Sequence, residues 1–236
     1  MNLQRLDKIV SSGKNISRAD ARKLIRQGKI TVGGEVIRDI SLRLDAQNSL
    51  IEFEGQALNY KEHIYILMNK PKGILSASND KSRKTVVDLV PDSMKRPGLF
   101  PVGRLDKDTT GLLIITDDGD FAHRVISPKK NIAKCYSVIL DGTLSAEMSN
   151  IFKKGVVLAD GTVCKPAQLN IIEENKAEII ITEGKYHQIK RMFGTVGLGV
   201  VELERISIGK LTLPENLAYG QCKELFISEI CEIFDN

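Results

Sequence analysis

The chain lacks the sequence features of several common protein classes. Its four cysteines, at positions 135, 164, 222 and 231, form no C-x-x-C pair and show no regular spacing. This argues against a zinc knuckle or a disulfide framework and favours reduced thiols. No run approaches the roughly eighteen apolar residues of a membrane span, and the N-terminus lacks the pattern of a cleaved signal. The sequence therefore predicts a cytoplasmic protein with no membrane segment.

Nucleotide-binding and metal-binding signatures are also missing. There is no G-x-x-x-x-G-K-[ST] loop, and the glycines at 194, 197 and 199 have the wrong order for a dinucleotide loop. They also follow an expected helix, whereas such a loop opens one. His187 has no second His or Cys at the spacing of metal ligands. We therefore expect no ATP, NAD, metal or other cofactor.

What the chain does have is an uneven charge. Its 236 residues are 42% hydrophobic and 27% charged, enough for a sizeable core in one large or two smaller domains. Residues 1–43 contain ten basic and four acidic side chains, a balance of +6, whereas the remainder has 24 basic and 26 acidic, a balance of −2. This asymmetry predicts an N-terminal region that binds a polyanion.

The N-terminal region has the pattern of two helices followed by a hairpin. Helices are expected over residues 3–11 and from a capping-box-like start at Ser17 to a stop near Gly28. A hairpin over 29–37 turns at Gly33-Gly34, and a strand spans 50–53. The second helix places four basic side chains on one face: Arg18, Arg22, Arg26 and Lys29. Such a face is either simply solvated or a contact for a polyanion.

The remainder of the chain predicts an α+β domain on a largely antiparallel sheet. The domains are expected at 1–58 and 64–236, with a linker at 59–63. Strands are expected after residue 106 and over 64–68, 133–140, 167–172, 177–182 and 200–206. Helices are expected over 85–90, 121–126, 145–154 and 187–196.

Residues 103–120, GRLDKDTTGLLIITDDGD, place Asp106 in a turn ahead of an apolar strand, a good way to hold a carboxylate rigidly. The acidic spacing nearly fits a calcium-binding EF-hand loop, but β-branched residues follow where a helix is required. Asp106 as a simple turn cap remains an alternative. A glycosidase pair with Asp108 is disfavoured, because side chains two apart on an extended segment point to opposite faces.

This string resembles the signature of the pseudouridine synthases that modify ribosomal RNA. The resemblance implies that Asp106 is the nucleophile and that Arg104 holds the flipped nucleotide or its phosphate. IAKCYSVIL, residues 132–140, resembles the second family motif, in which Tyr136 faces the target base. Alternation along the strand equally allows Tyr136 to be a core residue. The implied reaction needs no cofactor, because isomerising uridine involves no net redox change.

A third motif begins at residue 183, EGKYHQIKRMF, and is similar to the family pattern that supplies a cation to the catalytic Asp. Lys190 occupies that place, where other branches often carry Arg, and an adjacent cation favours the ionised carboxylate. The same resemblance assigns His187, Gln188 and Arg191 to the RNA. A solvated helix face is the alternative for this segment.

The N-terminal pattern resembles the S4 RNA-binding module, which assigns Arg18, Arg22, Arg26 and Lys29 to structured RNA. Residues 155–169 and the short C-terminal tail resemble the small-subunit branch, which acts on one uridine of 16S RNA, of the type at position 516. The resemblance implies a monomer bound to ribosomal RNA in a small-subunit assembly intermediate. The alternatives are a 23S RNA synthase and a non-catalytic ribosomal RNA-binding assembly factor.

Overall fold

The computed structural model describes residues 3–46, 48–58 and 60–235. Residues 1, 2, 47 and 236, and residue 59 of the expected linker, lie outside this description. The chain forms two compact units, Met1–Ile64 with Asp92–Leu99 and Tyr65–Pro91 with Phe100–Asn236. We call them the N-terminal and C-terminal units. No helix among the described residues is long and apolar enough to cross a membrane.

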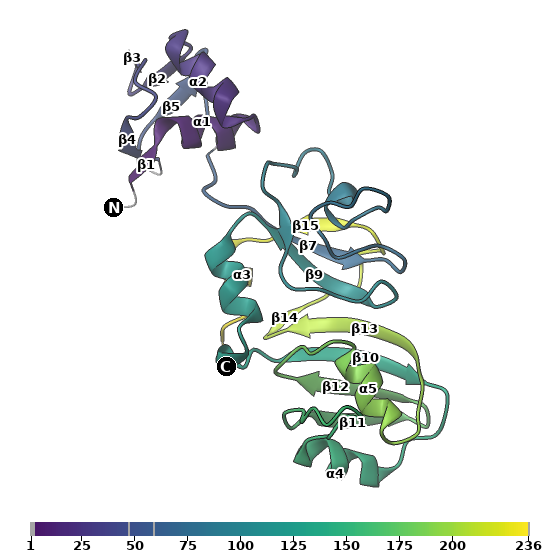
Figure 1. Ribbon diagram of the computed structural model, residues 1–236. Helices are drawn as coiled ribbons and strands as arrows, with labels where there is room; N and C mark the ends of the chain where they lie inside the picture. The colour runs from purple at the N-terminus through teal and green to yellow at the C-terminus, as the bar shows by residue number, and fades with distance from the viewer. Residues whose placement is uncertain (1–2, 47, 59, 236) are drawn as a thin grey trace. The chain divides into compact units, whose positions relative to one another are not determined.

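The N-terminal unit contains two helices and short strands (Figure 1). In chain order these are β1 Leu3–Arg5, α1 Leu6–Lys14, α2 Arg18–Arg26, β2 Ile30–Val32, β3 Glu35–Val36, β4 Arg43–Asp45, β5 Ile51–Phe53 and β6 Gln56–Ala57. The four-stranded sheet has the order β3-β2-β5-β6, and β1 pairs with β4. Buried apolar side chains of α1 and α2, including Leu6, Ile9 and Ile25, pack with Ile30 and Ile51. The helix pair thereby covers the small sheet with one apolar core.

Local signals account for α2 and the hairpin. Ser17 caps α2 by accepting a hydrogen bond from the Asp20 backbone N–H at 3.1 Å, as its sequence predicts. Gly33 and Gly34 both adopt the positive φ that the two-residue turn requires. The expected helix from residue 3 was wrong at its start, because residues 3–5 form β1 and pair with β4. Only this tertiary pairing makes the segment extended.

The C-terminal unit is built on one large sheet. Its elements are β7 Tyr65–Lys70, a 3-10 turn Val87–Leu89, β8 Phe100–Pro101, β9 Thr110–Thr116, α3 Gly119–Ile126, a 3-10 turn Pro128–Lys130, β10 Lys134–Leu140, α4 Ala146–Lys154, β11 Gln168–Glu173, β12 Lys176–Ile181, α5 Gln188–Gly194, β13 Val200–Ile208, β14 Leu211–Thr212, β15 Cys222–Glu224 and α6 Ile227–Cys231. Where a helix was expected at 85–90, the chain makes only a single 3-10 turn.

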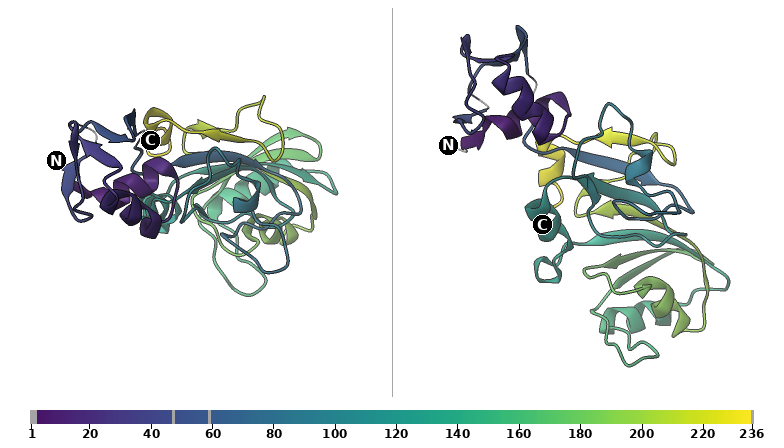
Figure 2. Two further views of the ribbon diagram at one scale, coloured as in Figure 1. Left: turned by 90° about the horizontal axis from the view of Figure 1, so that it is seen from above. Right: turned by 45° about the horizontal axis from the view of Figure 1, so that its top comes forward.

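The strand order of this sheet is β11-β12-β10-β13-β9-β7-β15, with β14 beside β13 and β8 beside β9. Its strands pair antiparallel except for β13 with β9, which confirms the α+β class. The late strand β15 returns to the β7 edge, in yellow beside β7 in Figures 1 and 2. Helix α4 contacts α5 through Phe152 and Phe193, whose ring centroids are 4.9 Å apart.

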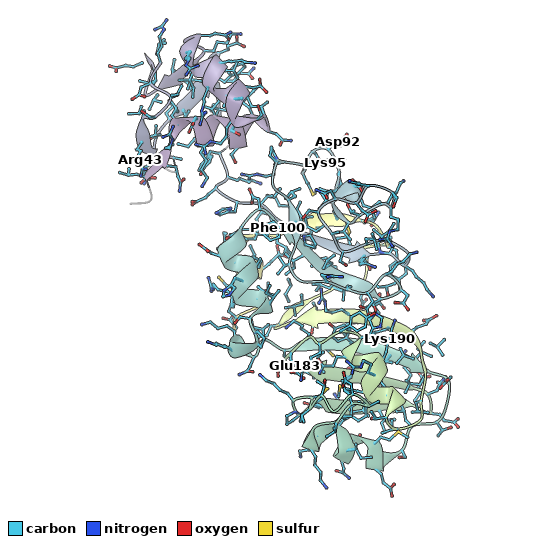
Figure 3. All side chains as sticks on the ribbon, viewed as in Figure 1. Arg43, Asp92, Lys95, Phe100, Glu183 and Lys190 are labelled. Carbon is cyan, nitrogen blue, oxygen red and sulfur yellow. The ribbon has the colours of Figure 1, made fainter. Side chains whose placement is uncertain are left out.

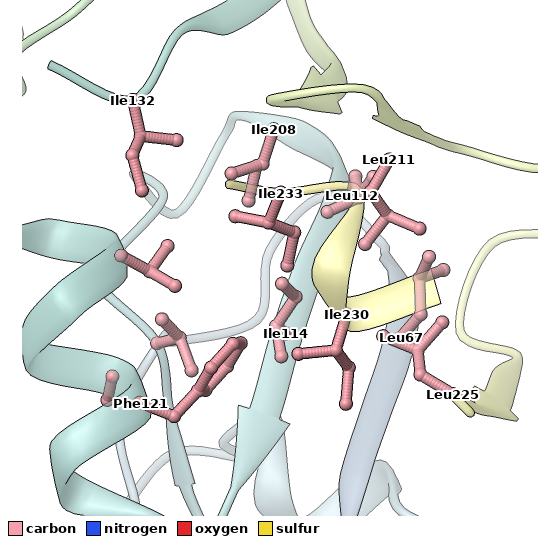
Figure 4. Close-up of a cluster of buried hydrophobic side chains, with 13 residues drawn as sticks. Leu67, Leu112, Ile114, Phe121, Ile132, Ile208, Leu211, Leu225, Ile230 and Ile233 are labelled. Atoms are coloured by element: carbon pink, nitrogen blue, oxygen red, sulfur yellow. The ribbon is translucent and has the colours of Figure 1, made fainter. Parts of the chain in front are cut away.

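A hydrophobic cluster fixes the half of the sheet that carries β7 and β9 (Figure 4). Leu67, Leu112 and Ile114 from these strands pack with Phe121 of α3 and Ile230 of α6, all of them buried. At roughly 1.5–3 kcal/mol for each fully buried large apolar side chain, the cluster is a major source of stability. It keeps β9, and therefore the loop that precedes β9, in a fixed position.

Strands β9 and β13 meet at Gly111. Their parallel pairing covers Glu204 with Thr110 and Arg205 with Gly111. Gly111 has φ of +97°, and a Cβ there would lie 2.3 Å from the Arg205 carbonyl oxygen. Glycine is therefore required for the two strands to approach each other. This contact brings the loop before β9 alongside the other half of the sheet.

Candidate active site

A buried lysine holds the loop that carries Asp106. Lys70, at the end of β7, is fully buried, and its Nζ donates to the carbonyl oxygens of Asp106 at 3.1 Å, Lys107 at 3.3 Å and Thr109 at 2.9 Å. It also donates to the Pro71 carbonyl at 3.1 Å. Burial lowers the pKa of Lys70 to about 8, against the opposing effect of nearby carboxylates, so the ammonium form persists at neutral pH. The loop is thus fixed through its backbone.

The Asp106 carboxylate lies between two basic side chains. Its Oδ1 is 3.5 Å from His187 Nε2, and its Oδ2 is 4.0 Å from Lys190 Nζ. The ammonium group of Lys190 lies closer to Asp108, with 2.6 Å to its Oδ2. This hydrogen bond is the main reason that the pKa of Asp108 lies below its ordinary value. Lys190 therefore bridges two carboxylates and does not form a close pair with Asp106 alone.

The geometry of an extended segment predicted that the carboxylates of Asp106 and Asp108 point to opposite faces. They do not. Residues 107 and 108 form a turn, and this turn brings both Asp106 and Asp108 to Lys190. The orientation argument against a paired-carboxylate site was therefore wrong. The loop also leads directly into β9, so the helix that an EF-hand requires after its loop is replaced by a strand.

His187 reaches Asp106 from an unusual backbone conformation. Its φ of 46° and ψ of 36° are left-handed, at the N-cap of α5, and its ring stacks on exposed Tyr186 with centroids 3.9 Å apart. Strained positions of this kind in non-glycine residues concentrate at functional sites. His187 therefore lies beside Asp106, and its expected contact with RNA stays a prediction.

Two side chains with internal hydrogen bonds keep the loop before α5 in this shape. Gln188 Nε2 donates to Glu183 Oε1 at 2.8 Å, and Gln188 Oε1 accepts from the Lys185 backbone N–H at 2.9 Å. Glu183 also accepts a hydrogen bond from the Lys165 backbone N–H. Figure 3 labels Glu183 and Lys190. Both Glu183 and Gln188 are buried. The amide of Gln188, expected to contact RNA, is therefore committed to the loop.

Side chains from both halves of the sheet line a recess around Asp106, which we call the Asp106 recess. Six of the expected site residues line it: Arg104, Asp106, Tyr136, His187, Gln188 and Lys190. Arg104 is exposed, and its guanidinium makes no hydrogen bond or ion pair among the described residues. The expected Arg191 does not line the recess and pairs with Asp160 at 2.5 Å.

Tyr136 is both a core residue and a lining residue. It lies on β10 and is only 7% exposed, yet it lines the Asp106 recess. The guanidinium of Arg205, itself buried on β13, lies 6.0 Å from the Tyr136 ring centroid and donates to the Leu112 carbonyl at 2.7 Å. Tyr136 can therefore be a core residue and also face the target base, because packing fixes a ring that lines the recess.

The sequence interpretation missed Lys70 and Arg205. The expected strand at 64–68 ended before Lys70, because a buried lysine has no local sequence signature. The usable signal was that residues 65–68 of β7 are apolar, as expected of a buried strand, which continues through Asn69 to Lys70. Arg205 had no such signal.

Of the four basic residues expected to bind RNA in the N-terminal unit, three form ion pairs within the unit. Arg18 and Arg22 donate to the fully buried Asp7 carboxylate at 2.7 and 2.9 Å, and Arg5 joins them at 3.1 Å. Lys29 pairs with Glu54 at 2.9 Å, whereas the Arg26 side chain makes no hydrogen bond or ion pair among the described residues. Three arginines around one carboxylate leave an ordered surface of net positive charge.

Known proteins resemble this chain over nearly its whole length. The family model for RNA pseudouridylate synthase matches residues 64–195, and that for the S4 domain matches residues 4–49. An uncharacterized RNA pseudouridine synthase of Bacillus subtilis, YtzG, is 39% identical over 96% of each chain. Ribosomal small subunit pseudouridine synthase A of Yersinia pestis is 38% identical over 97% of each chain. The crystal structure of a pseudouridylate synthase, 34% identical, matches with a TM-score of 0.68 over 97% of this chain and 99% of that one.

Proposed function

The chain belongs to the RNA pseudouridine synthases, and from this membership we propose that it isomerises one uridine of ribosomal RNA. The proposed target is a uridine of small-subunit 16S RNA, of the type at position 516. The name of the Yersinia pestis enzyme, a ribosomal small subunit synthase, supports the small subunit, and position 516 rests on the sequence resemblance alone. We propose that the enzyme acts as a monomer on a small-subunit assembly intermediate.

The observation that carries the proposal is the Asp106 carboxylate, held on a fixed loop within 4.0 Å of two basic groups and beside an aromatic ring. The reaction breaks the bond from the ribose to N1 of uracil, turns the base while it stays bound, and joins the ribose to C5, so that C5 loses a proton and N1 gains one. A rigid carboxylate serves each of the routes open to this reaction, whether it attacks the sugar, attacks the base or assists loss of the base.

Each neighbour of Asp106 has a proposed part. Lys190 places a positive charge beside one carboxylate oxygen, and His187 orients the other. Flipping a uridine out of folded RNA costs about a few kcal/mol, part of which stacking on the Tyr136 ring offsets. The exposed guanidinium of Arg104 holds the phosphate of the flipped nucleotide.

The N-terminal unit supplies affinity for the same RNA. Arg18, Arg22 and Arg26 lie on one face of α2, and contacts from such side chains to phosphates need no sequence readout. In the C-terminal unit, Arg191 and His187 add basic groups beside the Asp106 recess. We propose that the first set brings the RNA to the enzyme and the second positions the target.

Mapping of pseudouridine tests this function. Chemical probing of both ribosomal RNAs from cells that lack the protein should show one pseudouridine missing from 16S RNA. Expression of wild-type protein should restore it, whereas Asp106→Asn should not, because the amide is isosteric but cannot act as a nucleophile. If the missing pseudouridine lies in 23S RNA, the proposed 16S target is wrong. If Asp106→Asn restores the modification, the proposed catalytic role of Asp106 is wrong.

A further inference from the structure

A second recess lies directly beside the Asp106 recess. It holds about 240 Å³ and is lined by apolar groups of Pro71, Val201, Leu203 and Tyr219 and by Lys72 and Glu202. Leu203 lines both recesses, and Asp108, which is bonded to Lys190, lines the second. We call it the Tyr219 recess. Its volume is below the roughly 300–1,000 Å³ of pockets for drug-sized ligands, which suits a single small ring system.

Tyr219 is exposed but fixed in position. Its ring is 59% exposed, and its hydroxyl donates to Glu204 Oε1 at 3.1 Å. The loop that carries Tyr219 is tied to Asn69 by two hydrogen bonds. Asn69 Nδ2 donates to the Leu217 carbonyl at 2.7 Å, and the Asn69 backbone carbonyl accepts from the Gly220 backbone N–H at 2.7 Å. A held aromatic ring stacks on a base at little entropic cost, because it does not have to be ordered on binding.

The charges of the Tyr219 recess favour a base over a bare phosphate. Glu202 and Lys72 are exposed, and among the described residues neither side chain makes a hydrogen bond or ion pair. With Asp108 also in the lining, the recess has more acidic than basic groups, which disfavours an anion alone. A free carboxylate accepts hydrogen bonds from the exocyclic amino group of a base, and a single lysine suits that nucleotide's phosphate.

We propose that the Tyr219 recess binds the base of a nucleotide next to the target uridine. The base stacks on Tyr219, and its exocyclic amino group donates to Glu202. Adenine, cytosine and guanine fit this arrangement, whereas uracil has no amino group. The shared wall at Leu203 places this base beside a uridine bound in the Asp106 recess. The inference rests on the proposed function and adds to it a residue that selects the RNA sequence.

The test uses a synthetic RNA that contains the mapped uridine, and matched RNAs in which either neighbouring nucleotide lacks its base. Conversion of the intact RNA by wild-type enzyme tests the proposed function by itself. Tyr219→Ala should raise KM for intact RNA about tenfold, the size expected from loss of one stacked base. It should leave kcat within about twofold, because the reacting groups are untouched. Tyr219→Phe keeps the ring and should stay near wild type.

The abasic RNAs decide where the base binds. With one of them, wild type and Tyr219→Ala should have the same KM, because the stacking partner is already gone. Glu202→Gln should reduce the preference for an amino-bearing base at that position. Phe226→Ala removes a ring that is 72% exposed but does not line the Tyr219 recess, and it should leave KM unchanged. An equal loss for Tyr219→Ala on intact RNA and on both abasic RNAs overturns the inference.

Discussion

Replacing Asp7 by Asn tests how the N-terminal unit organises its basic surface. Asp7 is fully buried and accepts from three guanidinium groups, those of Arg5, Arg18 and Arg22. The amide keeps the shape of the side chain but removes its charge. Breaking a buried ion pair in this way typically costs about 3–5 kcal/mol. The three guanidinium groups are 38–50% exposed and recover part of the loss from water, so we expect about 2–3 kcal/mol.

The effect should depend on pH with a definite sign. Burial alone would raise the pKa of Asp7, but the hydrogen bonds from Arg5, Arg18 and Arg22 outweigh it and hold this pKa well below its ordinary value. The contribution to stability is therefore fully present above the ordinary carboxyl pKa. It is lost as the pH falls through the lower pKa of the folded protein. The difference between wild type and Asp7→Asn should thus be constant near neutral pH and shrink only in acid.

Hydrogen exchange read out by mass spectrometry is the suitable assay, because it reports on α1 and α2 separately from the C-terminal unit. RNA binding gives a second readout, in which the expected change is opposite to the one that net charge alone predicts. Asp7→Asn raises the net charge of the chain from +4, yet it should weaken binding because Arg18 and Arg22 lose their anchor. Glu35→Gln makes the same charge change at an exposed position and should bind RNA as well or better. Equal tightening by both variants, with unchanged exchange in α2, would refute the reasoning.

Three further predictions concern the C-terminal unit. Lys70→Met should lower the free energy of unfolding by about 2–4 kcal/mol, because buried carbonyls lose their donor. Between about pH 8 and 10.5 the unfolded chain keeps the Lys70 proton whereas the folded protein has lost it, and stability rises with pH wherever the unfolded state binds more protons. The free energy of urea unfolding of wild type should therefore rise relative to that of Lys70→Met over this range. A constant difference would contradict the low pKa of Lys70. Lys190→Met should slow turnover about ten- to a hundredfold. Loss of a group that donates directly to the reacting atoms typically lowers kcat by ~10²–10³, and the effect should be smaller here because Lys190 Nζ lies 4.0 Å from the Asp106 carboxylate. Lys190→Arg should retain most of the rate in single-turnover assays, and equal losses would show that charge is not its role. Gly111→Ala should cost about 3 kcal/mol or more in thermal unfolding, whereas Gly119→Ala, with open space around it, should cost almost nothing; similar losses would contradict the close approach of the strands.

The sequence correctly predicted α2 and the hairpin that follows it, because local signals set both. Ser17 begins α2 and Gly33-Gly34 turn the hairpin because capping and positive φ depend on a few adjacent residues. Strands β8, β14 and β15 were missed because each has only two or three residues and exists through pairing with a distant strand. Local pattern carries no information about such pairings.

The Asp106 recess was predictable in membership but not in geometry. The motifs indicated Asp106, Tyr136 and Lys190, and all three line it. The hydrogen bond from Lys190 to Asp108 was not expected, because it depends on a turn that spacing alone does not reveal. The buried state of Lys70 likewise depends on the whole fold and not on its neighbours in sequence.

The short parallel joint between β9 and β13 has a mechanical consequence. It pairs only two residues on each strand, yet it connects the half of the sheet that carries Asp106 to the half that carries Tyr136 and Lys190 (Figure 1). Side chains reinforce the joint, because Arg205 of β13 donates to the Leu112 carbonyl of β9 and Ile208 of β13 lies in one buried cluster with Leu112. The separation of Asp106 from Tyr136 across the recess therefore depends on a few contacts between β9 and β13.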